Sequence, residues 1–286
     1  MQKNIRKKSM KFIASTLLAI GFFVVSIEAQ AATFSDNFDS YANEAAVEAA
    51  GWSLDYTTLE STGCRSGKCL MATISTGGWL QYITHSLNEP APYIRFYAKR
   101  TNYPGGAGGS KFLKLFGDQS GVGYANSTLI QTYQNGQFYA ALTGDGSGTD
   151  NDQLCNWYWG NHTPQVPSGC TGVASVHGGT LDMVDNQWYE FEYHVYPNTN
   201  GNADGVIQLW VDGTLRLEYT GVIMRNDANT RNFSVFRFVD YVNETYPPSS
   251  PYQLWFDDVA VSQSYVGPVG GSDTIAPANP SGLSVT

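Results

Sequence analysis

The chain has 286 residues and a formal net charge of −9, with 14% aromatic and 14% charged residues. Five of its 16 basic residues and one of its 25 acidic residues lie in positions 1–31, which leaves 11 basic and 24 acidic residues, a net charge of −13. Such a surface repels nucleic acid and anionic membranes, and it disfavours a polyanionic substrate unless a local basic cleft overrides the overall field.

The first 31 residues have the pattern of a secretory signal peptide. A basic head precedes an apolar stretch over 12–27, and Ala29-Gln30-Ala31 forms a small-x-small cleavage site. The apolar stretch is too short for a retained membrane anchor and ends in Glu28. We therefore predict a protein that is secreted, periplasmic or on the cell surface, without membrane insertion.

The segment from 32 to 262 reads as one large all-β domain. It shows no convincing internal repeat, and the run ANEAAVEAA (42–50) is its one short helix candidate. Turn-forming residues separate alternating stretches that predict strands at 70–74, 79–84, 93–99, 112–116, 128–133 and 137–142. Strands at this spacing favour an antiparallel β-sandwich over a parallel α/β fold.

The four cysteines are expected to be structural. They allow three pairings, of which the two local ones, Cys64–Cys69 and Cys155–Cys170, are the economical choice in an oxidising compartment. A zinc site would need closely spaced cysteines with histidines at matching short spacings. The four histidines, His85, His162, His177 and His194, do not have such spacings.

The stretch 188–262 shows the clearest strand pattern. Tyr189, Phe191, Tyr193 and Val195 share one face, and Val206, Gln208 and Trp210 oppose Ile207, Leu209 and Val211. Near the end, Trp255, Asp257 and Val259 are expected to oppose Phe256, Asp258 and Ala260. The dipeptide Asp212-Gly213 is a two-residue hairpin signal, so the stretch predicts an antiparallel meander with aromatic residues on both faces.

After Ser262 the sequence becomes rich in proline and glycine. We interpret 263–286 as a linker whose last part, DTIAPANPSGLSVT, resembles the start of a fibronectin type III module. Only the first strand of such a module is present.

The late meander also carries a family resemblance. The stretches VIQLWVDG (206–213) and LWFDDVAVS (254–262), with IRFYAKR (94–100) and KFLKLFG (111–117) upstream, resemble concanavalin A-like jelly rolls of the polysaccharide lyases that act on alginate and glucuronan. The chain departs from that pattern at 233–248, where the lyases commonly have a Gly-Gly turn that forms part of the cleft. The resemblance implies the jelly-roll fold and, less specifically, cleavage by β-elimination.

A first candidate site is basic and aromatic. If Ile94, Phe96 and Ala98 face the core, then the opposite face presents a substrate-binding set, Arg95, Tyr97 and Lys99. Neighbouring strands of a jelly roll could add the catalytic candidates Lys114, His194, Arg225 and Tyr241. These residue types can neutralise a uronate carboxylate, remove the C5 proton and protonate the leaving oxygen. The alternative is that the basic residues only solubilise an exposed sheet.

A second candidate site is acidic. Glu190, Glu192 and His194 alternate on one strand, and carboxylates on the same face can reach the separation that a glycosidase of the laminarinase type uses. The glucanase motif ends in a further Glu, which this chain lacks. An ordinary polar sheet face remains the alternative.

Exposed aromatic residues form a third candidate set. Trp157 and Trp159 lie in the loop that Cys155–Cys170 would close, and Trp210 lies in the meander. Indole rings stack on the apolar faces of sugars, so we expect these residues to bind substrate. Buried tryptophans that plug the fold are the alternative for Trp157 or Trp159.

A structural calcium site is the fourth candidate. Asp36 and Asp39 open the domain, and Asp257 and Asp258 close it. In sandwiches of this kind the first and last strands often meet, and Ca²⁺ takes six to eight hard oxygens from carboxylates and carbonyls. Hydrogen bonding at strand ends is the alternative role of these aspartates.

Two functions of different classes follow from these features, and a third is kept open. The leading hypothesis is an exported, monomeric, polysaccharide-active protein that cleaves a uronate polysaccharide by lyase-like β-elimination without a redox cofactor. The alternative is a non-catalytic carbohydrate-binding or surface-adhesion module, and the third is a glycoside hydrolase of the laminarinase type. No nucleic-acid partner is expected.

Overall fold

The structure is a computed structural model that describes residues 32–74, 82–102, 110–116, 127–133, 137–143, 156–157, 173–176, 183–199, 202–222, 232–242 and 251–270. Two antiparallel sheets and one short helix, α1 (Glu44–Ala49), make up these residues. The predicted all-β sandwich is confirmed. In the described part of the chain, no helix is long and apolar enough to cross a membrane.

Within the described residues, sheet A has nine strands. Their spatial order is β11 (Val173–Val176), β14 (Thr214–Val222), β13 (Gly205–Val211), β12 (Tyr189–Tyr196), β6 (Tyr93–Thr101), β16 (Tyr252–Ser262), β4 (Cys69–Ile74) and β3 (Thr57–Glu60), with β1 (Phe34–Asp36) also paired to β16. The first and last strands of the domain therefore meet, as expected, and Phe34 is opposite Val261.

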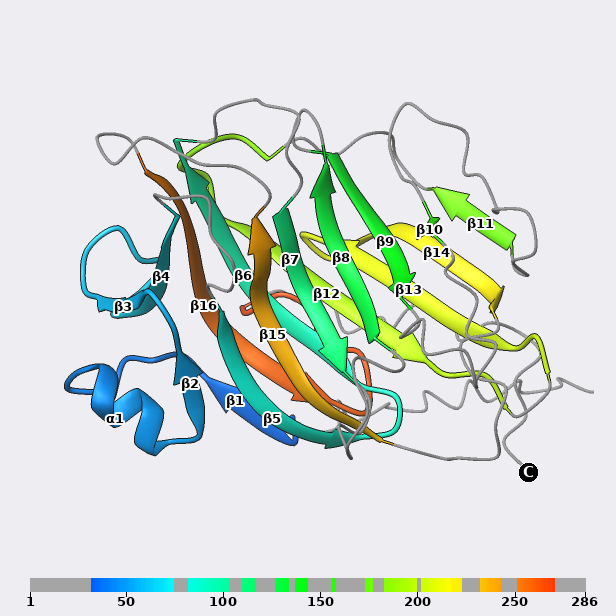
Figure 1. The fold of residues 1–286 in the computed structure, drawn as a ribbon, viewed down its shortest axis with the longest axis horizontal. Coiled ribbons are helices and arrows are strands. Elements are labelled where there is room, and N and C mark those ends of the chain that lie inside the picture. Colours follow the sequence, from blue (N-terminus) through cyan, green and yellow to red (C-terminus); the bar gives the residue numbers. More distant parts are fainter. Residues whose placement is uncertain are drawn as a thin grey trace, which may run out of the picture.

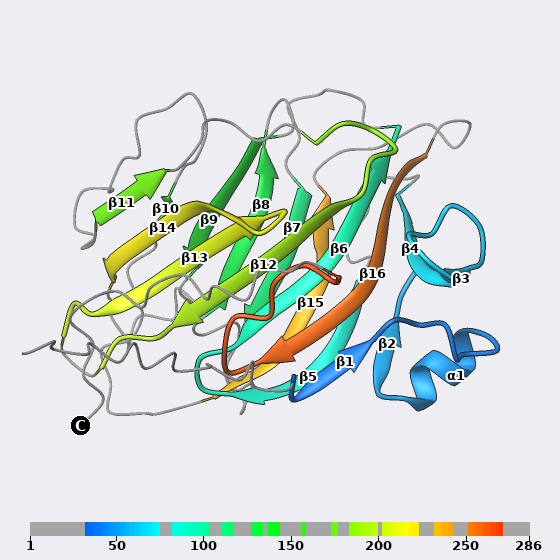
Figure 2. The same cartoon turned by 180° about the vertical axis from the view of Figure 1, so that it is seen from behind.

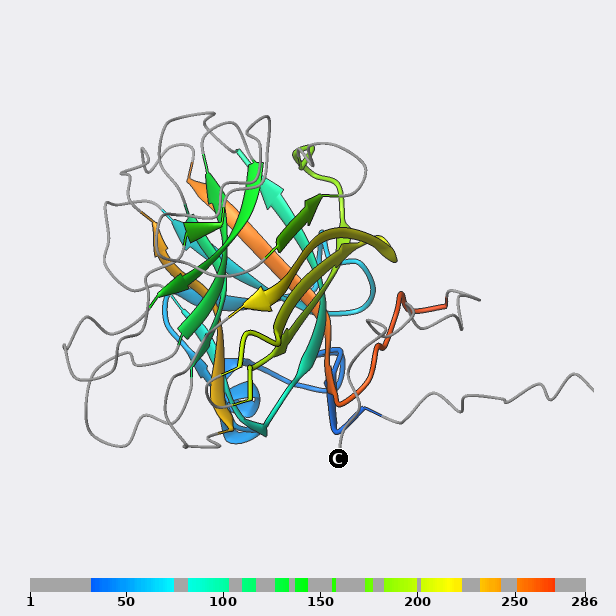
Figure 3. The same cartoon turned by 90° about the vertical axis from the view of Figure 1, so that its right-hand side faces the viewer.

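Sheet B has seven strands in the part of the chain that the structure describes. It lies in front in Figure 1, whereas sheet A lies in front in Figure 2. Its spatial order is β10 (Asn156–Trp157), β9 (Gln137–Thr143), β8 (Ser127–Tyr133), β7 (Ser110–Phe116), β15 (Phe233–Val242), β5 (Ile83–Glu89) and β2 (Trp52–Leu54). Figure 3 shows the two sheets as facing layers.

The core lies between the sheets and is built by strand alternation. Ile94, Phe96 and Ala98 of β6 are fully buried, as predicted. Across the sandwich, the ring of Phe238 in β15 lies 4.7 Å from Phe96 and 4.6 Å from Phe256. Each buried side chain of this size contributes about 1.5–3 kcal/mol relative to exposure, so such contacts hold the layers together.

The predicted faces of the meander are confirmed for β12 and β13. Phe191, Tyr193, Ile207 and Leu209 belong to the core cluster, while Trp210 points to the other face of sheet A. The hairpin between β13 and β14 turns at Asp212 (φ 49°) and Gly213 (φ 72°), which are the two positive φ angles that a type I′ turn requires.

The predicted alternation of β16 is wrong after Asp257. A register shift against β6 lies between Asp257 and Ala260, and Asp258 has a φ of 47°. The bulge adds one residue, so Val259 enters the core instead of sharing a face with Asp257. A prediction based on strict alternation of faces does not account for an inserted residue.

The local predictions are otherwise close to the structure. The helix is shorter than the predicted 42–50, because Asn43 caps its N-terminus by accepting a hydrogen bond from the Ala46 amide at 3.0 Å. Strand β5 begins at Ile83; of its predicted range 79–84, residues 79–81 lie outside the described residues. The short strands β1, β2 and β3 were not predicted.

One predicted disulfide is confirmed, between Cys64 and Cys69. Cys155 and Cys170 lie outside the described residues. Part of the expected linker also has a structural role: residues 264–270, which we name the strap, lie across the outer face of sheet A.

Candidate functional site

Strand pairing brings three polar positions together on sheet B. Arg237 of β15 is directly opposite Lys114 of β7 on one side and Thr84 of β5 on the other. Their neighbours along the three strands belong to the core: Leu113, Leu115, Phe236, Phe238 and Ile83. Alternation therefore assigns this row to the face of sheet B that points away from the core.

The guanidinium of Arg237 is held in place from two directions. Its Nε donates to Thr84 Oγ1 at 3.2 Å, and its Cζ lies 4.6 Å from the centre of the Tyr82 ring. A guanidinium that is fixed by a hydrogen bond and a ring keeps its planar fork in one orientation. Such a fork matches the geometry of a carboxylate.

Further polar residues extend this row along the same two strands. Tyr241 of β15 is opposite Lys111 of β7, with a register irregularity between it and Phe238. Three basic positions, Lys111, Lys114 and Arg237, therefore lie on adjoining strands of an otherwise acidic protein. This is the local basic region that an acidic polysaccharide would need.

The predicted catalytic set is divided between the two sheets. Lys114 and Tyr241 are on adjacent strands of sheet B, but His194 is on β12 of sheet A. Arg225 and Trp159 lie outside the described residues, and Trp157 is in β10 at the far edge of sheet B. Alternation specifies the face of a strand but not its sheet, so the sequence could not separate these residues.

His194 is enclosed by its neighbours. Its ring stacks on Tyr93 with centroids 3.7 Å apart, and its Nδ1 donates to the Pro92 carbonyl at 3.1 Å. Burial lowers the pKa of His194 to about 4, since desolvation disfavours the imidazolium. A neutral, stacked and buried imidazole has a packing role.

Arg95, Tyr97 and Lys99 do share the outer face of sheet A, as predicted, but they are 7%, 7% and 6% exposed. Lys99 Nζ lies 4.2 Å from the centre of the Trp255 ring and 5.1 Å from that of Trp188. It also donates to the Gly63 carbonyl. Lys99 therefore holds the disulfide loop against sheet A.

The strap covers much of this face. The amides of Val266 and Gly267 donate to the two carboxyl oxygens of Glu192 at 2.7 and 2.8 Å, and the Val269 amide donates to Tyr97 Oη at 2.9 Å. Tyr265 packs on Trp210 with ring centroids 5.3 Å apart. Trp210 is 1% exposed, which does not suit the substrate contact that we predicted for it.

The two acidic residues of β12 are buried under the same cover. Glu190 and Glu192 are 1% and 0% exposed. Desolvation raises the pKa of Glu190 to about 8 and that of Glu192 to about 7. Because backbone amides occupy Glu192 and Glu190 accepts from the Gly213 amide at 3.0 Å, the pair does not face a substrate as a glycosidase pair would.

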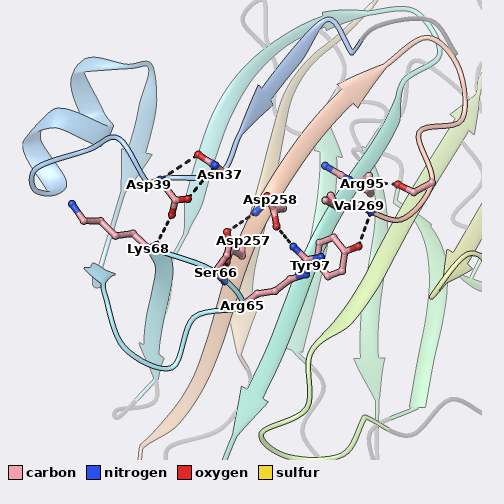
Figure 4. Close-up of polar contacts among 11 residues, drawn as sticks. Asn37, Asp39, Arg65, Ser66, Lys68, Arg95, Tyr97, Asp257, Asp258 and Val269 are labelled. Atoms are coloured by element: carbon pink, nitrogen blue, oxygen red, sulfur yellow. Dashed lines mark hydrogen bonds and ion pairs between the residues drawn. The ribbon is translucent and has the colours of Figure 1, made fainter. Parts of the chain in front are cut away.

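The four aspartates at the chain ends bind different partners, and Figure 4 shows three of them, Asp39, Asp257 and Asp258. Asp36 accepts from the Phe38 amide, Tyr41 Oη and Trp52 Nε1 at 2.8, 2.6 and 2.9 Å. Asp258 forms an ion pair with Arg65. Both carboxylates thus have partners within the protein.

Asp39 and Asp257 both bind the backbone of the disulfide loop. Asp39 accepts from the Lys68 amide at 2.6 Å, and Asp257 accepts from the Ser66 amide at 3.3 Å. Desolvation, with the nearby Asp258 and Asp39 charges, raises the pKa of Asp257 to about 7. Among the described residues, no three His, Cys, Asp or Glu side chains converge to hold a metal ion. Calcium binding stays a prediction, with Asp39 and Asp257 as its best-placed carboxylates.

Sequence reasoning missed Arg237. It lies in the segment 233–248, for which the sequence analysis noted only that the Gly-Gly turn of the lyases is missing. The alternation Phe236-Arg237-Phe238, with its two buried phenylalanines, was the available signal that Arg237 faces outward.

A family model and several solved structures match this chain. Residues 124–260 match the family model of polysaccharide lyases. No match was found among curated proteins.

Solved structures share the fold at low sequence identity. The alginate lyase Aly36B, in a variant bound to an alginate tetrasaccharide, is 14% identical, with a TM-score of 0.54 over 80% of this chain and 96% of its own. The endo-β-1,4-glucuronan lyase of the fungus Trichoderma reesei is 12% identical, with a TM-score of 0.52 over 81% and 95%. The cellulose-induced protein Cip1 is 17% identical, with a TM-score of 0.52 over 82% and 99%. The chain is thus a concanavalin-like jelly roll that resembles polysaccharide lyases of the alginate and glucuronan type, and its residues 124–260 match the polysaccharide lyase family.

Proposed function

We propose that the protein is an exported polysaccharide lyase that cleaves a uronate-containing polysaccharide on the outer face of sheet B. The observation that carries this proposal is the match of residues 124–260 to the polysaccharide lyase family. The matched segment includes β15, which contributes Arg237 and Tyr241 to the basic row described above.

The chemistry of β-elimination fits the residue types of this row. A base removes the proton at C5 of the uronate, the C4–O bond breaks, and a C4–C5 double bond forms while the leaving oxygen takes up a proton. Negative charge that develops on the uronate carboxylate needs a positive partner, and the fixed guanidinium of Arg237 supplies it. Lys114 and Tyr241 are the titratable residues of adjoining strands for the two proton transfers.

Sheet A is less suitable for this reaction. On its outer face, Glu192 accepts from the strap and Glu190 accepts from the Gly213 amide. His194 stacks on Tyr93, and Lys99 lies against tryptophan rings. Arg237 on sheet B is half-buried and its row lies on the outer face. The negative net charge of the protein repels a polyanionic substrate at long range, but the basic row on sheet B attracts it locally.

The test is a panel of uronate polysaccharides, monitored for the ultraviolet absorbance of unsaturated products. We expect absorbance to rise with at least one of glucuronan, alginate and pectate, and Arg237→Gln to lower the rate. Arg216→Gln, on β14 of sheet A, is the matched control and should cleave at the unchanged rate. If no absorbance rise occurs with any polymer while the protein still binds one of them, the function is carbohydrate binding without cleavage.

A further inference from the structure

A pocket of about 500 Å³ lies at the edge of sheet A, away from the row on sheet B. Strand β1, the turn that follows it and the bulge of β16 form its walls, and Arg95 of β6 also lines it. Ser35, Ala260 and Arg95 are successive register partners across β1, β16 and β6.

The walls of the pocket depend on two unusual backbone positions. Asp258, in the bulge of β16, and Phe38, after β1, both have positive φ, at 47° and 61°. Residues other than glycine rarely adopt this conformation, and bulges often redirect a side chain at a functional site. The bulge places Asp258 on the lining of the pocket.

Arg95 is the lining group whose hydrogen bonding is incomplete. It is 7% exposed, its Nη1 reaches the Gly267 carbonyl at 3.5 Å, and its Nε has no partner. Among the described residues it forms no ion pair within 4.0 Å, although its charge partly opposes the desolvation that raises the pKa values of Glu190 and Glu192. A buried guanidinium with unused donors is costly unless an acceptor completes its bonding.

The acidic residues of the pocket, in contrast, have partners. Asp36 accepts three hydrogen bonds from protein donors, and Asp258 is paired with Arg65. Figure 4 shows the Asp258–Arg65 pair and Arg95 on the same side of sheet A. The pocket's incompletely bonded group is therefore the positively charged donor Arg95, which favours a carboxylate ligand over a metal ion.

The rest of the lining suits the hydroxyl groups and ring of a sugar. Ser35, Asn37 and Ser40 are exposed polar residues at the pocket, and the half-buried rings of Phe34 and Tyr41 offer apolar surface. Few polar groups beside aromatic walls are typical of small-molecule sites. The volume is sufficient for one or two sugar units.

We propose that this pocket is a second glycan-binding site, which seats an acidic sugar unit with its carboxylate against Arg95. The site would hold a polysaccharide on the sheet opposite the cleavage face. The choice of an acidic sugar among carboxylates rests on the proposed function, whereas the site itself rests on Arg95 and the pocket.

The test measures binding of a glucuronate trisaccharide by calorimetry to the full chain in an Arg237→Gln background, which weakens the other face. We expect one remaining site, with Arg95→Gln weakening its Kd about tenfold to hundredfold, as loss of a charged hydrogen-bond partner does. Asn37→Ala with Ser40→Ala, two exposed changes, should weaken binding without lowering the melting temperature. The matched control, Arg216→Gln, should bind as the background does.

Three results would overturn the proposal. They are an affinity that Arg95→Gln and the Asn37/Ser40 double variant leave unchanged, equal binding of acetate or a neutral glucose trisaccharide, and displacement of the bound trisaccharide by Ca²⁺. The cleavage assay on the parent protein is scored separately. Failure of the second-site proposal would appear only in the binding measurement, and failure of the proposed lyase activity would appear only in the cleavage assay.

Discussion

Arg237 and Arg95 carry the same charge, yet their surroundings assign them different roles. Arg237 is fixed by Thr84 and the Tyr82 ring on the outer face of sheet B, whereas Arg95 is buried beside the strap on sheet A. Sequence alternation predicted correctly that Arg95 points away from the core. It could not predict which residues would cover Arg95, because the strap lies more than 160 positions further along the chain.

At the residue scale, the planar fork of Arg237 should matter as well as its charge. We expect Arg237→Gln to lower kcat/KM about 10²–10³-fold, the typical loss when one donor to a developing negative charge is removed. Arg237→Lys keeps the charge but loses the Nε bond to Thr84, so it should recover only part of the rate. Steady-state kinetics on the best polymer measures both. Equal activity of the Lys variant and the parent would show that a point charge suffices.

At the scale of elements, the sequence predicted strand faces well and strand partners poorly. The alternation of β6, β12 and β13 follows from apolar residues at every second position, which the core requires. The division of Lys114 and His194 between two sheets depends on long-range pairing, which periodicity does not encode. The bulge at Asp258 needs its local geometry, so the predicted alternation failed there.

The elements that carry the chain ends lead to a prediction about calcium. Asp39, after β1, and Asp257, in β16, both reach the disulfide loop. Desolvation raises the pKa of Asp257, and the negative charges of Asp258 and Asp39 raise it further. A calcium ion shared by these carboxylates and backbone carbonyls would remove that repulsion. We predict that it stabilises the fold by about 2.7 kcal/mol at a hundredfold excess over its Kd.

Thermal melting in chelator and in millimolar calcium tests this prediction. Chelation should lower the Tm of the parent, and Asp257→Asn should abolish most of the difference. Asp36→Asn is the matched control, because Asp36 already accepts three protein hydrogen bonds and should leave the calcium response in place. Identical melting curves of the parent in both buffers would leave these aspartates with a hydrogen-bonding role alone.

At the scale of the whole molecule, sheet A concentrates buried acids and sheet B presents basic positions. Glu190, Glu192 and Asp257 all lie on the outer face of sheet A and are at most 1% exposed. The net charge of the chain is strongly negative, but its distribution over the two sheets is not readable from composition. The buried acids make the stability of the whole domain depend on pH.

The direction of that dependence follows from the pKa shifts. In the folded protein the pKa values of Glu190, Glu192 and Asp257 are raised to about 8, 7 and 7, so between about pH 4 and 8 the folded state binds more protons than the unfolded state. The stability that these groups contribute is fully present below their unfolded pKa values. It is lost progressively as the pH rises from there to the folded values of 7–8, at about 1.4 kcal/mol per pH unit for each group. His194 acts in the opposite direction, because its lowered pKa costs stability as the pH falls from 6.5 towards 4.

We therefore predict greatest stability near pH 4–5 and a melting temperature that falls between about pH 5 and 8. Glu190→Gln keeps the shape of a neutral acid and should flatten the alkaline side of this profile, because Glu190 has the highest of the three raised pKa values. The exposed Glu48→Gln, on α1, is the matched control and should follow the parent profile. Melting curves at half-unit pH steps measure the effect. A melting temperature that stays constant or rises from about pH 5 to 8 would mean that these carboxyls are already ionised in the folded protein, with their charge balanced by Arg95 and the strap amides.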